Sequence, residues 1–156
     1  QERATAMNKP VVYIATADAG DTEMVQRIAL HKRNRPAEWE VREVPFQLPA
    51  TLADLSGSDK TVLVDCLTLW LTNLLMKDVA VMQQGMSDLV AAVTAFKGDL
   101  ILVSNEVGWG IVPMGELSRQ FQDNTGRLHQ DLAQIVERVT LSVAGIPLDV
   151  KTDEVG

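Results

Sequence analysis

The sequence predicts an α/β fold in which a mainly parallel sheet is flanked by helices. The first observation is a set of three segments, 11–16, 61–67 and 99–105, that are apolar on both faces like covered central strands. The second is that helical patterns alternate with these strands, an order typical of parallel pairing. The third is that no repeat or linker divides the 156 residues. We therefore expect one α/β domain over residues 1–156.

The N-terminal part is expected to run helix, strand, helix. Residues 1–7 have the pattern of the end of a helix, and the first central strand follows them. Asp21 or Thr22 can cap a second helix, because a side-chain oxygen there can accept from the free backbone N–H groups. Asn34 and Pro36 end this helix, since proline cannot continue it.

The middle of the chain alternates regular and irregular segments. A short strand at 40–44 precedes a turn-rich segment, 45–59, in which we expect no regular element. The second central strand leads into an apolar helix that ends near Met76. Residues 77–87 are polar and rich in methionine, and we expect a loop there before a helix over 88–96.

The C-terminal part contains the clearest helical pattern. The third central strand leads into residues 106–115, whose three glycines and one proline exclude a regular element. An amphipathic helix is predicted over 116–139, with a possible break near Gly126. Beyond it we expect one strand, 140–144, and an irregular tail.

The composition excludes several classes of protein. The net charge of −7 argues against a nucleic-acid binder, because such proteins cluster Lys and Arg against phosphates. An anionic ligand would be held locally, by backbone amides, a few cations or Mg²⁺. The single cysteine, Cys66, excludes a disulfide framework and is interpreted as a core residue. The most apolar stretch, 61–76, is interrupted by Asp65 and is shorter than a membrane span, so we expect a cytoplasmic protein.

Polar residues that directly follow predicted strands are candidates, because ligands bind at the carboxyl ends of parallel strands. Asp65 could hold Mg²⁺ beside phosphates or simply cap the following helix. His31 could attack phosphorus and form a phosphoramidate, or lie in a solvated basic helix end with Lys32, Arg33 and Arg35. No G-x-x-x-x-G-K-[ST] motif is present, so these residues alone do not demonstrate a binding site for a nucleoside triphosphate.

Further polar residues have simpler interpretations. Glu106 follows the third central strand and could orient a hydroxyl or cap the turn. Arg119, Asp123 and Arg127 form one helical stripe, which favours a solvated face over a contact with a subunit or an anionic ligand. His129, on the same helix, is expected to be structural or on the surface.

Taken together, these segments resemble the bifunctional adenosylcobinamide kinase / adenosylcobinamide-phosphate guanylyltransferases. The match runs in the family's order through nearly the whole chain. Its segments are YIATADAGDTEMVQRIALHKRNRPAEWEVRE, VLVDCLTLWLTNLL, LVSNEVGWGIVP, RQFQDNTGRLHQDLAQ and SVAGIPL. The H-x-x-x-R-P turn and the N-E-V-G-x-G-I-V-P string are the specific motifs.

The resemblance implies a P-loop NTPase fold of the RecA-like kind, assembled as a homotrimer. It implies two reactions that use Mg²⁺ and GTP, with ATP possible for the kinase step. A nucleoside triphosphate phosphorylates adenosylcobinamide. GMP then passes from GTP through a histidine to adenosylcobinamide phosphate, giving adenosylcobinamide-GDP and pyrophosphate.

The resemblance also implies roles for individual residues. His31 matches the histidine that carries GMP. Asp65 matches a GTP-binding position, and its carboxylate would help to place Mg²⁺ there. The other nucleotide-contacting positions match Ala15, Thr16, Ala17, Lys32, Arg33, Asn34, Arg35 and Glu43.

The sequence departs from the family at its start. Members begin with a strand and a G-G-x-R-S-G-K-S phosphate loop, whereas this sequence begins with the helix pattern of residues 1–7. We therefore expect that strand and loop to be missing, together with residues near 77–87 and near the C-terminus. Without the loop, the alternatives are a monofunctional guanylyltransferase or a non-catalytic corrinoid- or nucleotide-binding subunit. A generic P-loop ATPase or recombinase-like protein would not explain the H-x-x-x-R-P turn.

Overall fold

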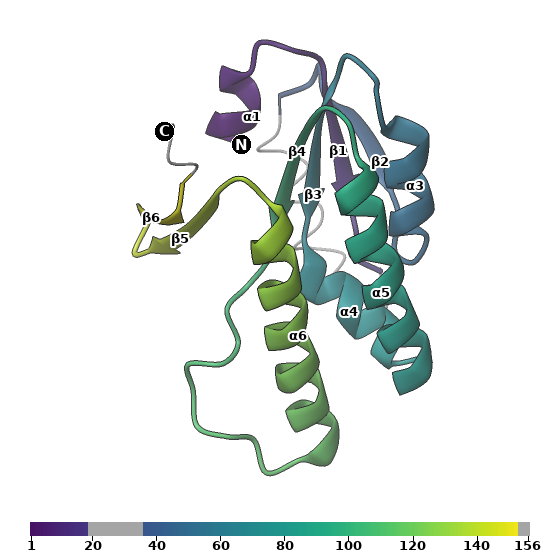
Figure 1. Cartoon of the computed structure of the whole chain (residues 1–156), viewed down its shortest axis with the longest axis vertical. Coiled ribbons are helices and arrows are strands. Elements are labelled where there is room, and N and C mark those ends of the chain that lie inside the picture. Colours follow the sequence, from purple (N-terminus) through teal and green to yellow (C-terminus); the bar gives the residue numbers. More distant parts are fainter. Residues whose placement is uncertain (19–35, 153–156) are drawn as a thin grey trace.

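A computed structural model describes residues 1–18 and 36–152 of the chain. The elements in this part are α1 (Glu2–Ala6), β1 (Val11–Ala15), β2 (Glu40–Glu43), α3 (Leu48–Leu55), β3 (Thr61–Asp65), α4 (Leu67–Leu75), α5 (Val79–Ala95), β4 (Asp99–Val103), α6 (Glu116–Ile135), β5 (Val139–Val143) and β6 (Ile146–Lys151). They form a four-stranded sheet in the order β2-β1-β3-β4 and a two-stranded sheet of β5 and β6 (Figure 1). None of the helices in these ranges combines the length and the apolar character needed to cross a membrane.

All neighbouring strands of the four-stranded sheet are parallel, and their ends lie at one level. Ala15 is aligned with Glu43 of β2 and with Asp65 of β3, and Asp65 is aligned with Val103 of β4. β1 is buried along its whole length, as expected of a strand with neighbours on both sides. The predicted mainly parallel sheet flanked by helices is therefore confirmed, and each strand ends slightly earlier than expected.

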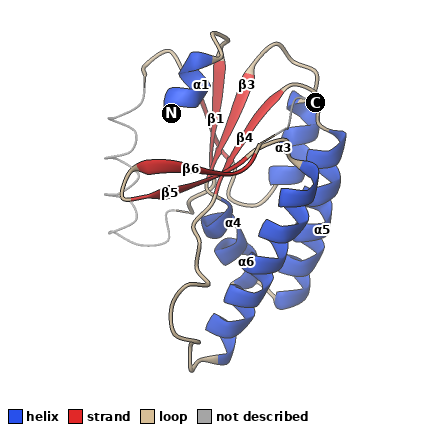
Figure 2. Cartoon of the chain, turned by 60° about the vertical axis from the view of Figure 1, so that its left-hand side comes forward, coloured by secondary structure: helices blue, strands red, loops and turns tan. Residues whose placement is uncertain are grey.

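The two faces of this sheet are covered by different layers. Alternate side chains of β1 and β3, such as Ile14 and Val64, belong to the larger core cluster with residues of α3, α4, α5 and α6. The intervening side chains, such as Tyr13 and Leu63, pack with Ala4 of α1 on the other face. Figure 2 shows α3, α5 and α6 together on one side of the strands.

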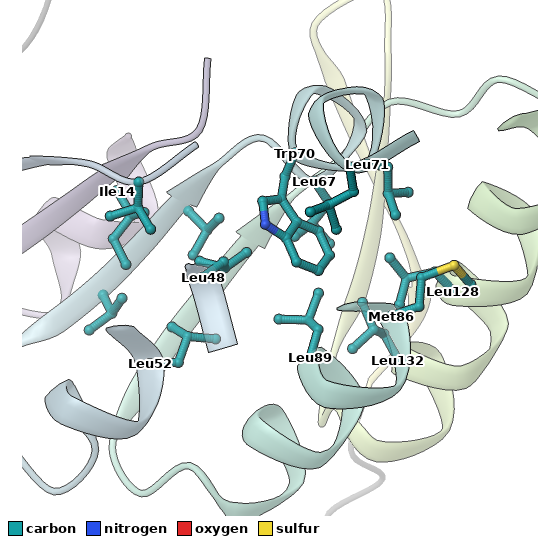
Figure 3. Packing of buried hydrophobic residues seen from close by; sticks show 14 of the residues in the cluster. Ile14, Leu48, Leu52, Leu67, Trp70, Leu71, Met86, Leu89, Leu128 and Leu132 are labelled. Carbon is teal, nitrogen blue, oxygen red and sulfur yellow. The ribbon is translucent and has the colours of Figure 1, made fainter. Parts of the chain in front are cut away.

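Trp70 of α4 lies at the centre of the larger cluster. Its side chain is fully buried, and its indole Nε1 donates to the backbone carbonyl of Phe46 at 3.0 Å. Figure 3 shows the ring among Leu48 of α3 and Leu89 of α5. One aromatic side chain thus joins three helices, and burying it contributes roughly 2–3 kcal/mol to stability.

The expectation that residues 45–59 are irregular is wrong, because α3 lies within them. Leu48, Leu52 and Leu55 are buried and are spaced as one face of a helix. Pro49 is in the first turn, where a missing N–H loses no helical hydrogen bond. The segment is therefore a short helix with a proline in its first turn.

The loop predicted at 77–87 is also wrong, because α5 occupies almost all of it. The side chain of Asp78 caps this helix by accepting from the backbone N–H of Ala80 at 2.7 Å. Gly85 lies where α5 approaches α4 closely: a Cβ atom there would be 2.6 Å from Leu74 Cδ1. The glycine that weakens the helical pattern in the sequence therefore allows the two helices to pack.

Three C-terminal predictions need correction. α6 is unbroken at Gly126 and ends at Ile135, before the end predicted from its pattern. The segment expected to be an irregular tail contains β6, which pairs antiparallel with β5. Ala144 and Gly145 form the turn between these strands with φ angles of 53° and 78°, as tight hairpins require. Residues 106–115 are irregular, as predicted.

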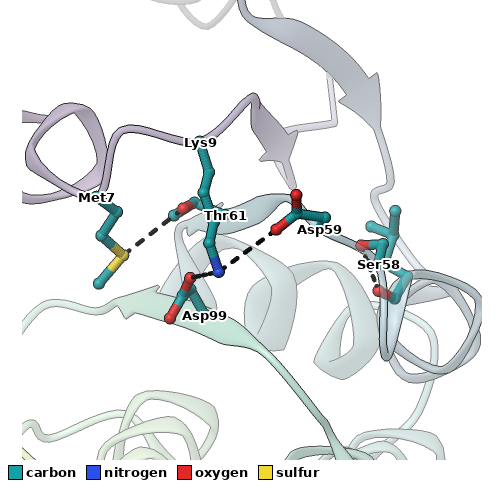
Figure 4. A network of polar contacts seen from close by, with 7 residues as sticks. Met7, Lys9, Ser58, Asp59, Thr61 and Asp99 are labelled. Carbon is teal, nitrogen blue, oxygen red and sulfur yellow. Dashed lines mark hydrogen bonds and ion pairs between the residues drawn. The ribbon is translucent and has the colours of Figure 1, made fainter.

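Ion pairs link residues at the amino ends of the strands of the four-stranded sheet (Figure 4). Lys9 Nζ lies 2.8 Å from Asp99 Oδ2 and 3.6 Å from Asp59 Oδ1. The hydrogen bond to Asp99 raises the pKa of Lys9, so this amine stays charged. Exposed ion pairs of this kind add little stability, and we interpret them as links between the starts of β1 and β4.

Candidate functional site

Five of the predicted site residues lie at the carboxyl edge of the four-stranded sheet. Ala15 lies in register between Glu43 and Asp65. The backbone N–H of Thr16 donates to the carbonyl of Asp65 at 3.2 Å, and Ala17 comes next in the chain, half-buried. Glu43 is exposed at the end of β2. The structure therefore brings these residues together at the edge where parallel sheets bind their ligands.

The side chain of Thr16 is held at this edge by two buried hydrogen bonds. It is fully buried, donates to the carbonyl of Cys66 at 2.7 Å and accepts from the N–H of Cys66 at 2.9 Å. The amide of Asn73 on α4 donates to the carbonyl of Thr16 at 2.8 Å and to that of Pro45 at 3.0 Å. The ends of β1, β2 and β3 are thus held together by hydrogen bonds to the backbone.

Asp65 ends β3 with its side chain half-buried. The buried hydroxyl of Tyr13 donates to its Oδ2 atom. Asp65 does not cap α4, because the N-cap residue of that helix is Cys66, which makes no side-chain cap bond. The structure therefore contradicts the capping interpretation of Asp65, and its role as a metal ligand stays a prediction.

The side chains around Asp65 limit the kind of metal site that could form there. Mg²⁺ keeps several waters and is usually bound through one or two carboxylates together with substrate phosphates. Within residues 1–18 and 36–152 there is no group of three or more His, Cys, Asp or Glu side chains that could hold a metal ion. The described residues thus form no protein cage for a metal ion, and a site at Asp65 would need further ligands from water or phosphate.

The structure adds His129, which the sequence did not single out for function. Its Nε2 atom lies 2.7 Å from Ser104 Oγ, and its Nδ1 atom lies 3.8 Å from Glu106 Oε2. Burial lowers the pKa of His129, although the Glu106 carboxylate acts in the opposite direction. No sequence signal could have found this pairing, because Ser104 and His129 are 25 residues apart and in different elements.

Two other side chains discussed in the sequence analysis have structural contacts. Arg119, the first residue of the charged stripe on α6, donates to the backbone carbonyl of Pro113 at 3.1 Å and also to that of Met114. It therefore closes the loop before α6. Cys66 is a buried free thiol, as predicted, and its Sγ atom lies 3.2 Å from Thr68 Oγ1.

The remaining predicted residues belong to segment 19–35, which lies outside the described part of the chain. Their assignments stay predictions from the resemblance. They are His31, Lys32, Arg33, Asn34 and Arg35.

Comparison with known proteins shows what the whole chain is similar to. Residues 1–150 match the model of a family described as cobinamide kinase / cobinamide phosphate guanyltransferase. The chain is similar to the bifunctional adenosylcobalamin biosynthesis protein CobP of Pseudomonas aeruginosa, with 51% identity over 142 residues that cover 90% of this chain and 82% of the relative. It is also similar to the bifunctional adenosylcobalamin biosynthesis proteins CobU of Salmonella typhimurium and Escherichia coli. These are 37% and 36% identical over 155 residues, covering 90% of this chain and 86% of each relative.

Proposed function

This chain belongs to the cobinamide kinase / cobinamide phosphate guanyltransferase family, and we infer from this that it catalyses both reactions. It phosphorylates adenosylcobinamide with a nucleoside triphosphate and then transfers GMP from GTP to the phosphorylated product. Adenosylcobinamide-GDP and pyrophosphate are the final products. The match over residues 1–150 is the observation that carries this function.

We further propose that the nucleotide binds at the carboxyl edge formed by Ala15, Thr16, Ala17, Glu43 and Asp65. The alignment of these residues across three parallel strands supports the proposal. The buried hydrogen bonds of Thr16 support it too, because they hold the backbone at the end of β1 in one position. A fixed backbone can be approached closely by a phosphate or a base.

His31 is proposed as the residue that carries GMP. A neutral imidazole nitrogen attacks the α-phosphorus of GTP, a P–N bond forms, and the bond to the bridging oxygen breaks so that pyrophosphate leaves. A phosphate oxygen of adenosylcobinamide phosphate then attacks the same phosphorus and releases the imidazole. The cations of Lys32, Arg33 and Arg35 would neutralise phosphate charge, and Asn34 would supply a neutral hydrogen bond.

Asp65 is the proposed protein ligand for Mg²⁺, with ATP or GTP as the phosphate source of the kinase step. When bound, the metal offsets negative charge on the triphosphate. The Tyr13 hydroxyl supports this role, because its bond to Oδ2 orients the carboxylate. Asp65 would therefore present a positioned oxygen ligand to the metal.

We also propose that the chain is one nucleotide-binding domain that works as a homotrimer in the cytoplasm. Exposed apolar side chains in the loop before α6 support a subunit contact: Trp109 is 74% exposed, Ile111 96% and Met114 97%. Light scattering on a size-exclusion column would give the mass directly. A monomeric mass at assay concentration would contradict the trimer.

The proposed roles are tested with the full-length protein, Mg²⁺ and GTP labelled at the α-phosphate, followed by denaturation. We expect wild type to retain a label that is acid-labile and base-stable, and His31→Asn to retain none. The kinase step, followed separately with a γ-labelled triphosphate and adenosylcobinamide, should persist in the variant. If wild type binds GTP but retains no label, His31 is only a contact residue and the two-step transfer is wrong.

A further inference from the structure

Side chains at the end of β4 contact two different helices. Ser104, Asn105 and Glu106 follow directly after Val103, where β4 ends. Ser104 and Glu106 approach His129 of α6, whereas the amide of Asn105 donates to Thr68 Oγ1 on α4 at 2.7 Å. The backbone after β4 is therefore held between α4 and α6.

The side of α6 that meets this backbone is polar over two turns. Gln122 donates to the carbonyl of Val107 at 3.1 Å, and His129 lies seven residues further along the same face. Ser104 Oγ is 2.7 Å from the imidazole Nε2. The contacts at 104 and 107 fix the direction in which the chain leaves the sheet.

A neutral imidazole suits both of its contacts. With its proton on Nδ1, the ring directs an N–H towards Glu106 and accepts the Ser104 hydroxyl proton at Nε2. Burial lowers the pKa of His129 and so favours this neutral form. Glu106 is restrained in turn, because its Oε1 atom accepts from the backbone N–H of Gly108 at 2.6 Å.

The same backbone is linked to the proposed nucleotide edge through Asn105. Its partner Thr68 lies 3.2 Å from the thiol of Cys66, and the backbone of Cys66 exchanges two hydrogen bonds with Thr16. Cys66 directly follows Asp65. A continuous series of polar contacts thus joins α6 to the residues that are proposed to contact nucleotide and metal.

We propose that His129 is a positioning residue: its bond to Ser104 holds the end of β4 against α6 and thereby sets the place of Asn105 at the nucleotide edge. The inference rests on the proposed function, since it concerns the reactions at that edge. His129 acts through Ser104 and Asn105 and needs no contact with the substrate. Loss of the bond should misalign reacting groups more than it weakens nucleotide binding, because none of the proposed nucleotide-contacting residues is removed.

The test compares His129→Ala, His129→Gln, Ser104→Ala and the double variant Ser104→Ala/His129→Ala. Gln130→Ala, at an exposed position of the same helix, is the matched control. Kinase and GMP-transfer rates are measured with the full-length protein at several GTP concentrations, below the melting temperature of every variant. We expect His129→Ala to lower kcat about tenfold while KM for GTP changes by less than about threefold. Glutamine can replace the bond to Ser104, so His129→Gln should recover most of the loss.

The double variant shows whether the two substitutions act through the same hydrogen bond or through two separate effects. If the bond carries the effect, Ser104→Ala and His129→Ala should lower kcat to similar values, and the double variant should be no worse. Multiplying losses, or a His129→Ala rate equal to wild type, would overturn the inference while leaving the proposed function intact. A wild type without either activity would instead contradict the proposed function, and the inference with it. If His129→Ala does not fold, Ser104→Ala and His129→Gln decide the question.

Discussion

Replacing Thr16 by valine tests whether the hydrogen bonds at the end of β1 hold the sheet edge together. Valine has almost the same shape, so the change removes a hydroxyl and leaves no cavity. That hydroxyl makes two buried bonds, donating to the carbonyl of Cys66 and accepting from its N–H. After the change the carbonyl keeps a second donor, the N–H of Trp70 at 3.2 Å, whereas the N–H of Cys66 loses its side-chain partner.

The expected loss of stability follows from that one N–H group. A buried donor left without a partner costs about 1–3 kcal/mol, and the weakened carbonyl adds to this cost. The new buried methyl group offsets about 0.8 kcal/mol. We therefore expect Thr16→Val to lower the free energy of unfolding by about 2 kcal/mol, or the melting temperature by about 4–8 °C for a chain of this size.

The assay is urea unfolding followed by tryptophan fluorescence. Thr94→Val is the matched control, because Thr94 is exposed on α5 and its hydroxyl only donates to the carbonyl of Val90 four residues earlier. The control should change stability by less than about 0.5 kcal/mol. Equal effects of the two variants would refute the reasoning, since the buried pair of bonds would then contribute no more than one at the surface.

Three further outcomes are expected. Thr125→Val should raise stability by about 1 kcal/mol in the same urea assay, because the Thr125 hydroxyl is fully buried and has no partner among the described residues; a loss would mean that it has one. His129 has a pKa below its usual value when folded, so below about pH 6.5 the unfolded chain binds more protons than the folded chain and stability falls. The stability difference between wild type and His129→Gln should therefore shift against wild type from pH 7.5 to 5.5, and a constant difference would contradict this. Asp65→Asn should raise the Mg²⁺ concentration for half-maximal rate by at least about tenfold, and an unchanged Mg²⁺ curve would exclude Asp65 as a ligand.

Apolar strands made most of the sheet predictable from the sequence. A parallel strand covered on both faces is a continuous apolar run, and β1, β3 and β4 all have that signature. Among the elements without such a run, α3 and β6 were missed, and α5 was predicted only from residue 88 onwards. The helix α3 has a proline in its first turn, α5 contains Gly85 at a helix contact, and β6 is mostly exposed. Packing against other elements favours α3 and the start of α5 over a weak local pattern, and pairing with β5 does the same for β6.

The candidate site could likewise be predicted only in part from the sequence. Thr16 and Asp65 could be placed at one edge because each directly follows or ends a recognisable strand. The contact between Ser104 and His129 depends on how α6 packs against the sheet, which no spacing in the sequence expresses. Residue chemistry made His31 a candidate nucleophile, and only the resemblance gave it the role of carrying GMP; it lies outside the described residues.

Asn73 has a consequence for the energetics of binding. Its side-chain amide donates both to the backbone carbonyl of Thr16 and to that of Pro45. These two bonds hold the backbone after β1 and the backbone after β2 in one arrangement. If the nucleotide binds at this edge as proposed, it would lose little free energy to the ordering of that backbone. The same backbone would meet ATP and GTP, so discrimination between them would depend on the hydrogen bonds that the base makes.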